Sequence, residues 1–325
     1  MFYLLRYLSL FINTDKFKNC FEQVRMNLDS LKDDEEFQIF HRHAVIGKFG
    51  TIFSMIFVYT SLAIFTLTFF SPHILDIVIP LNESRERWHF PDSLEYFIDQ
   101  EKHLYLLAGY LFLVALVGMN TALATETASM AYVQHICAMF SITSYRIERI
   151  VNRNQMRLKD SLRKFENYAD IAEIVDSHQR AIKCVHMCNS ILGICFLLII
   201  IVGVISLSVN LFRFCNNIMT SSDNLTVASM LFLYILSHFV FMFLGNYFGQ
   251  EVINYSDDVF KKIWSTRWYA TPLQMQKCLL VIMHRSMKSS TLVIGCMFIL
   301  SLEGLATLIS TSLSYFMMIY SVRQT

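Results

Sequence analysis

The chain has 325 residues, of which 54% are hydrophobic and 16% are charged, with 4 prolines and 10 glycines. This balance differs from that of a soluble domain, in which about a quarter of the residues are charged. The net charge of +1 gives no indication of nucleic-acid binding. The sequence contains no HExxH, GxSxG, phosphate-loop or Rossmann glycine motif, so we expect no enzyme activity and no cofactor.

The apolar residues are clustered in segments long enough to cross a bilayer, which requires about 20 apolar residues in a helix. Residues 1–12 are apolar but too few to cross, and we interpret them as the end of a span. The sequence therefore predicts an all-α membrane protein, a helical bundle with the end of one span and five complete ones. The complete spans are residues 49–70, 104–124, 190–211, 227–248 and 291–320.

The segments between the spans differ in charge. Residues 13–48, 125–189 and 249–290 hold 21 of the 27 Lys and Arg residues. Because basic residues favour the cytoplasmic side, we place these three segments inside the cell. The amino terminus is then inside and the carboxy terminus outside. The extracellular parts are the loops 71–103 and 212–226 and the tail 321–325.

Two glycosylation sequons fall in the loops assigned to the outside. Asn82 begins one of them, with Ser84, and Asn224 begins the other, with Thr226. Because N-linked glycans are attached to surface loops on the outer side, we predict Asn82 and Asn224 as glycosylation sites. A third sequon, at Asn254, is on the inner side in this orientation and is expected to stay unmodified.

The cytoplasmic segments are expected to be helical. No proline or glycine occurs between Tyr132 and Met187, and apolar residues recur there at helical spacing. A helix that leaves the bilayer with an apolar stripe must bury that stripe, which favours a packed cytoplasmic anchor over a solvated, charged stalk. Cys184 and Cys188 would share one helix face while His186 points away, so we expect no metal site there.

An ordered series of motifs begins at the Gly249-Gln250-Glu251 turn predicted at the end of a span. It continues with Trp264, the Trp268-Tyr269 pair, the run LLVIMHRSMK, and the patterns LSLE and SLSYF in the last helix. The stretch HICAMFSITSYRIERIV, from His135, is a weaker match. In these motifs the chain resembles the insect odorant receptors, of the tuning type. Because that family has seven spans, we expect the first span and most of the second to be missing.

The resemblance implies a function as well as a fold. Members of the family are understood as tetrameric cation channels in which a tuning subunit joins a shared co-receptor. The chain is therefore expected to be a subunit of an odorant-gated channel, in a hetero-tetramer with the odorant co-receptor. Its surroundings would be the lipid of the plasma membrane, in the dendrites of olfactory sensory neurons, and its ligand a small apolar volatile molecule.

An apolar ligand needs a buried cavity with one or two polar groups that orient it. The resemblance implies that this cavity is in the outer half of the helices, and plain helix packing is the alternative for each residue. The candidate ligand-binding residues are Phe57, Thr60, Ile64, Thr68, Tyr105, Leu106, Tyr110, Phe232 and His238.

The last predicted span mixes small hydroxyl residues with apolar ones, as in helices that pack tightly or face a wet pore. Ser314 is a candidate for the wet side. By the resemblance, Met318 and Val322 occupy the positions of an apolar ring that closes the pore. Glu303 would cost about 3 kcal/mol inside a span. It either lies on the ion path or at a subunit contact, or it makes a structural hydrogen bond.

Two alternatives remain. Gustatory receptors share the architecture but tend to end in a Thr-Tyr then Gln-Phe pattern, whereas this chain ends in SYFMMIYSVRQT and keeps only the tyrosine. The odorant branch is therefore preferred. The other alternative is a truncated subunit that does not conduct ions and only modulates assembly.

Overall fold

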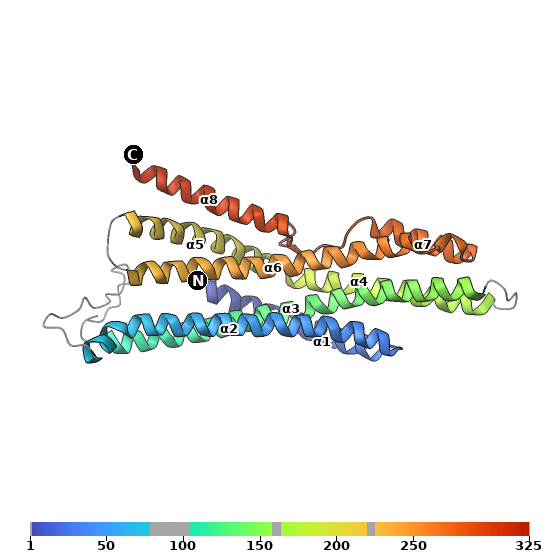
Figure 1. Ribbon diagram of the computed structural model, residues 1–325, viewed down its shortest axis with the longest axis horizontal. Coiled ribbons are helices and arrows are strands. Elements are labelled where there is room, and N and C mark those ends of the chain that lie inside the picture. The colour runs from blue at the N-terminus through green and yellow to red at the C-terminus, as the bar shows by residue number, and fades with distance from the viewer. Residues whose placement is uncertain (1, 79–103, 158–163, 220–224, 325) are drawn as a thin grey trace.

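The computed structural model describes residues 2–78, 104–157, 164–219 and 225–324, which form an elongated bundle of helices (Figure 1). The long helices run roughly along one axis and lie side by side. In chain order the elements are α1 Phe2–Asp29, α2 Asp34–Val78, α3 Leu104–Arg157, α4 Lys164–Ile191, α5 Ile194–Met219, α6 Leu225–Ser265, η1 Trp268–Ala270, α7 Leu273–Ser286, β1 Val293–Ile294, β2 Phe298–Ile299 and α8 Leu302–Gln324.

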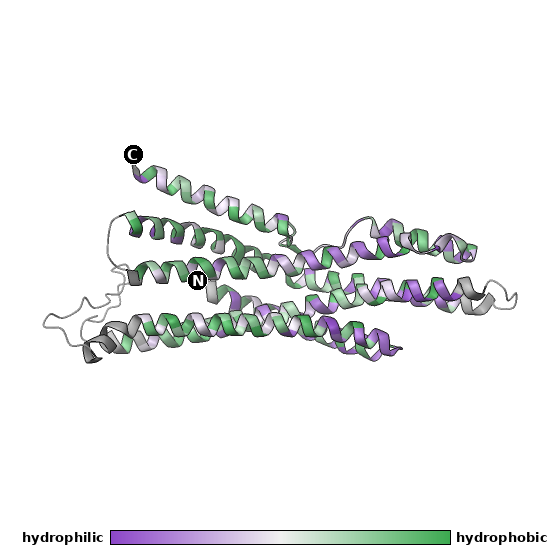
Figure 2. Ribbon diagram, in the orientation of Figure 1, coloured by the Kyte–Doolittle hydropathy of each residue, from purple (hydrophilic) through white to green (hydrophobic). Residues whose placement is uncertain are grey.

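The three longest helices, α2, α3 and α6, are too long to lie within a bilayer. At a rise of 1.5 Å per residue, the 54 residues of α3 extend over about 80 Å, against about 30 Å for a hydrocarbon core. Figure 2 shows apolar residues concentrated in the half of the bundle that contains α5 and α8, and hydrophilic residues in the other half. The prediction of an all-α bundle whose helices continue far beyond the membrane is confirmed.

Among the described residues, four helical stretches are long and apolar enough to span a membrane. Each overlaps one of the predicted spans and continues past it at one end: Asp34–Thr68, Ile194–Met219, Val227–Ser265 and Leu302–Arg323. The fifth predicted span, residues 104–124, forms the first part of α3.

The polar half of the bundle has a continuous apolar core. Ile147, Ile150 and Val151 of α3 are fully buried, as is Ile174 of α4. They share this core with residues of α6 and α7, among them Val259. The stripe predicted from the sequence is therefore packed against neighbouring helices, and the solvated stalk is not what forms.

The last predicted span begins differently from the expectation. Residues 291–301 are not helical; β1 and β2 pair antiparallel in a short hairpin, and α8 begins only at Leu302. Gly295 and Cys296 both have positive φ, 57° and 60°, and the Met297 N–H donates to the Ile294 carbonyl at 3.1 Å. Short apolar runs fit a strand as well as a helix, which is why the sequence pattern did not reveal the hairpin.

Two further helix boundaries differ from the prediction. The span predicted at 190–211 is interrupted by Leu192 and Gly193, and α5 then continues to Met219, into the predicted outer loop. The turn predicted at Gly249 does not form, and α6 runs on to Ser265. A Cβ on Gly249 would lie 2.4 Å from the Leu300 Cβ and 2.5 Å from its carbonyl oxygen. The absence of a side chain at Gly249 therefore allows α6 to pack closely against the segment before α8.

Candidate functional site

A cavity of about 530 Å³ lies among the helices of the apolar half. Residues from α2, α3, α5 and α6 line most of it, and Arg6 of α1 is also in the wall. The lining is mainly aliphatic, aromatic and methionine side chains, including Phe57, Met119, Phe241 and Met242. A mostly apolar cavity of this size with a few polar groups is typical of sites for small organic ligands.

Helical periodicity explains which side chains face the cavity. On α6 the lining residues recur every three or four positions, so they form one stripe: Tyr234, Ser237, His238, Phe241, Met242 and Gly245. The stripe on α5 has the same spacing and contains Ile199, Gly203, Ser206, Asn210 and Arg213. Both stripes line the cavity, and the polar members of each lie toward the α5–α6 connection.

These polar side chains are partly engaged by their own helices. The Asn210 amide Nδ2 donates to the Ser206 carbonyl at 2.8 Å. His238 Nδ1 is 2.8 Å from the Tyr234 carbonyl oxygen, and the Ser237 hydroxyl donates to the Leu233 carbonyl at 2.8 Å. Each side chain is thus held in a fixed orientation beside the cavity.

An ion pair lies farther along the wall, toward α4. The Arg6 guanidinium pairs with the Glu126 carboxylate, and the two side chains are 7% and 14% exposed. The Arg6 guanidinium also lies 6.0 Å from the centre of the Phe196 ring. Because buried charges are tolerated only when paired, this contact lets two ionised groups stand in an otherwise apolar wall.

Two of the predicted ligand-binding residues, Phe57 and His238, line the cavity. Thr60 is exposed on α2, and its hydroxyl donates to the Ile56 carbonyl at 2.6 Å. Ile64 and Thr68 lie farther along α2 than Ser61, the last cavity residue of that helix.

Three of the remaining candidates, Leu106, Tyr110 and Phe232, do not line the cavity. Leu106 and Tyr110 of α3 are 69% and 58% exposed, and Phe232 of α6 is 55% exposed, with its ring near that of Phe214. The side chain of Tyr105 is outside the described residues, as are the sequon residues Asn82 and Asn224.

The cavity also reaches the segment that leads into the last helix. Leu292, Ile294 and Leu300 line it, together with Leu308 of α8. Asn189 of α4 fixes this segment, because its Oδ1 accepts from the Val293 N–H at 2.9 Å and its Nδ2 donates to the Thr291 carbonyl at 3.0 Å. A ligand in the cavity would therefore touch the base of α8.

The predicted pore residues lie on exposed parts of α8. Met318 and Val322 are 58% and 71% exposed, and Ser314 is exposed as well. Glu303 is exposed in the first turn of α8, where a carboxylate interacts favourably with the helix dipole. On the bundle side of α8, the hydroxyl of Ser208 from α5 lies 2.9 Å from the Ser312 carbonyl oxygen.

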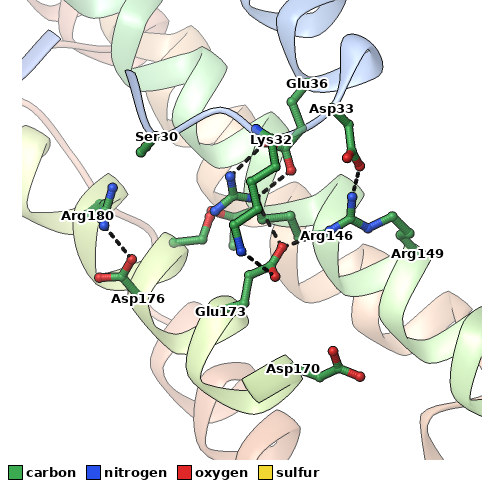
Figure 3. A network of polar contacts seen from close by, with 12 residues as sticks. Ser30, Lys32, Asp33, Glu36, Arg146, Arg149, Asp170, Glu173, Asp176 and Arg180 are labelled. Carbon is green, nitrogen blue, oxygen red and sulfur yellow. Dashed lines mark hydrogen bonds and ion pairs between the residues drawn. The ribbon is translucent and has the colours of Figure 1, made fainter. Parts of the chain in front are cut away.

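A network of charged groups ties the α1–α2 connection to α3 and α4 (Figure 3). Arg146 of α3 forms an ion pair with Glu36 of α2. Glu173 of α4 forms ion pairs with Lys32 at 2.9 Å and with Arg149 at 2.8 Å. Burial acts to raise the pKa of Glu173, but the neighbouring cations outweigh it and hold the pKa below its usual value. Over the described ranges, no group of three or more His, Cys, Asp or Glu residues could hold a metal ion.

Four polar residues that line the cavity were not among the predicted ligand-binding residues: Arg6, Glu126, Asn210 and Arg213. The available signal was charge inside or beside an apolar segment, since Arg6 interrupts residues 1–12 and Arg213 follows the predicted span 190–211. Polar groups in such places usually face a partner or a cavity.

The fold and the site define a multi-span α-helical membrane protein with an apolar ligand cavity next to its last helix. A family model described as 7tm Odorant receptor matches residues 1–313, and the chain belongs to this family of insect odorant receptors. The family and the fold together identify it as an olfactory receptor subunit in a membrane. The family assignment drawn from the tail motifs is confirmed.

Solved structures agree with this assignment. The chain is similar to the insect olfactory receptor OR5 from Machilis hrabei in complex with eugenol, with a TM-score of 0.75 and 15% identity over 99% of this chain and 78% of the other. The structure of OR5 described without eugenol gives a TM-score of 0.65 at the same identity and the same coverage of both chains. At this identity the likeness establishes the fold alone. No curated protein matches the chain.

Proposed function

We propose that this olfactory receptor subunit binds a small volatile odorant in the described cavity and thereby gates a non-selective cation channel. It would act as the tuning subunit of a hetero-tetramer with the odorant co-receptor, in the plasma membrane of olfactory sensory neurons. The observation that carries the proposal is the shared wall between cavity and last helix: Leu292, Ile294, Leu300 and Leu308 line the cavity and belong to α8 or its lead-in segment.

A ligand can move an equilibrium only by as much as it prefers one conformation over the other. Because part of the cavity wall is the lead-in to α8, an occupant contacts the element whose position it would change. The exposed face of α8, with Ser314, Met318 and Val322, supports a role in lining the pore once several subunits surround one axis. Hydroxyl groups would line the wet part, and the apolar side chains would close it by dewetting.

The orientation in the membrane belongs to the same proposal. Basic residues are concentrated in the polar half of the bundle, which supports a cytoplasmic anchor, an inner amino terminus and an outer carboxy terminus. The outer tail then begins close to Val322, so the external pore mouth would lie there.

Whole-cell current recording tests the proposal. Cells expressing this chain, the co-receptor, or both receive a panel of volatile compounds, and surface labelling verifies that each protein reaches the membrane. We expect a cation current that requires both subunits and an odorant. Silence across the panel, with normal surface expression, would refute odorant gating and favour a modulatory subunit.

A further inference from the structure

We propose that the cavity selects elongated aliphatic alcohols, with the ligand hydroxyl held by Asn210, Arg213 and His238 at the end of the cavity near the α5–α6 connection. This inference rests on the proposed function and specifies the chemical class of the ligand. It follows from the shape of the cavity and from the hydrogen-bonding capacity left at that end.

The cavity is elongated. Along α5 its lining extends from Phe196 to Arg213, which at 1.5 Å per residue is about 26 Å. An extended chain can follow the cavity over this length, and most of the side chains that it would contact are apolar. Arg6 and Glu126, the charged groups of the wall outside the polar end, are paired with each other.

Two acceptors remain available at the polar end. The Tyr234 carbonyl can only accept, so His238 Nδ1 carries the hydrogen of their 2.8 Å contact, and in that tautomer of the uncharged ring Nε2 can accept a hydrogen bond. By the same reasoning the Asn210 Nδ2 donates to the Ser206 carbonyl, which leaves the Oδ1 of Asn210 as an acceptor. Both residues line the cavity.

The same end also holds donors. Arg213 lines the cavity three residues after Asn210 and is close enough to Tyr234 to interact with it electrostatically. Among the described residues, no carboxylate forms an ion pair with Arg213, and Glu126 of the cavity wall is paired with Arg6. The Arg213 guanidinium and the Tyr234 hydroxyl can therefore donate to a ligand oxygen.

A hydroxyl group matches this set because it donates one hydrogen bond and accepts others. An ether of the same length accepts only, so it leaves Asn210 and His238 without a donor. Sites built to hydrogen-bond a hydroxyl group reject analogues that lack it, because their own polar groups are then left unpaired.

The test compares two ligands of one length, decan-1-ol and methyl nonyl ether. Dose–response curves are recorded from cells expressing the chain with the co-receptor, for the unaltered protein and for Asn210→Leu, His238→Phe and the double variant. His284→Phe, at an exposed position of α7 outside the cavity, is the matched control. Binding of radiolabelled decan-1-ol to the purified full chain gives a readout that does not depend on current.

We expect a half-maximal concentration for the alcohol about tenfold below that for the ether, the effect of one or two net hydrogen bonds. Each cavity variant should reduce this preference, and the double variant should abolish it while the response to the ether persists, which verifies that the variant folds. An alcohol response no stronger than the ether response, or a preference that survives in the double variant, would overturn the inference but leave odorant gating intact. If no compound, including those of a broad odorant panel, binds to the chain or evokes a current, the proposed function and this inference are overturned together.

Discussion

Arg146 donates hydrogen bonds from both Nε and Nη2 to the two carboxylate oxygens of Glu36, each at 2.7 Å. The two side chains are 5% and 0% exposed, and they join α3 to the start of α2. A bidentate contact of this kind fixes orientation as well as distance. It fixes the start of α2 against α3 in the polar half of the bundle.

Glu36→Gln should destabilise the protein by about 3 kcal/mol, because it leaves the buried guanidinium of Arg146 without its main counter-charge. Differential scanning fluorimetry of the detergent-solubilised protein would show a lower Tm. Asp258→Asn, which removes the exposed partner of Lys261, is the control and should leave Tm unchanged. Equal Tm values for the Glu36 variant and the unaltered protein would show that the network contributes nothing to stability.

Because of His178, the folded protein should lose stability in mild acid. Burial, and then the charge of Arg285, lowers the pKa of His178 to about 4, whereas the ordinary value is 6.5. Between these two values the unfolded chain binds a proton that the folded chain does not, so stability falls as pH decreases from 6.5 toward 4, by roughly 3 kcal/mol in full. Above pH 6.5 the effect is absent.

Tm measured from pH 7.5 to 4.5 checks this prediction. His178→Gln can still hydrogen-bond to Ser286, the 3.4 Å partner of His178, and cannot titrate. It should lose less Tm in acid than the unaltered protein does. Parallel pH profiles for the two proteins would contradict the assignment.

Two glycines of α6 should respond oppositely to alanine. At Gly249 an added Cβ would overlap the Leu300 backbone, so Gly249→Ala should cost about 2 kcal/mol or more. At Gly245 nothing lies within 4 Å of an added Cβ, and alanine is the better helix former by about 1 kcal/mol. Tm should therefore fall for the first variant and stay or rise for the second. The reverse order would mean that the lead-in to α8 does not pack as described.

Glycan mapping tests the proposed orientation. In membranes that support N-glycosylation, Asn82→Gln and Asn224→Gln should each remove one glycosidase-sensitive shift in mass, and Asn254→Gln should remove none. A shift that depends on Asn254 would instead place the polar half of the bundle outside and invert the orientation.

Much of the architecture could be predicted because length and hydropathy constrain membrane helices strongly. The apolar segments and the buried stripe through Ile147 and Ile174 follow from periodicity alone. The family followed from ordered motifs in the tail. The hairpin at 293–299 could not be predicted, because its apolar sequence fits a helix equally well and its shape depends on contacts with Asn189, about a hundred residues away in the chain.

The cavity was harder to predict than the helices. Of the nine ligand-binding candidates, Phe57 and His238 line it, because helical spacing defines a face but not which face meets a void. The α5 wall was missed entirely. Asn210 and Arg213 line the cavity together with residues of α6, and the sequence of α5 alone does not show that these two helices are neighbours.

The contact between Ser208 and Ser312 lies midway along α8, ten residues from Leu302 and ten from Val322. A stiff rod that pivots at its midpoint moves its two ends in opposite directions by equal amounts. If α8 turns as a unit about this contact, a displacement of the hairpin end by a bound ligand reappears undiminished, with its sign reversed, at the far tip. At that tip Arg323 hydrogen-bonds to Asn216 of α5, so such a swing would strain this bond.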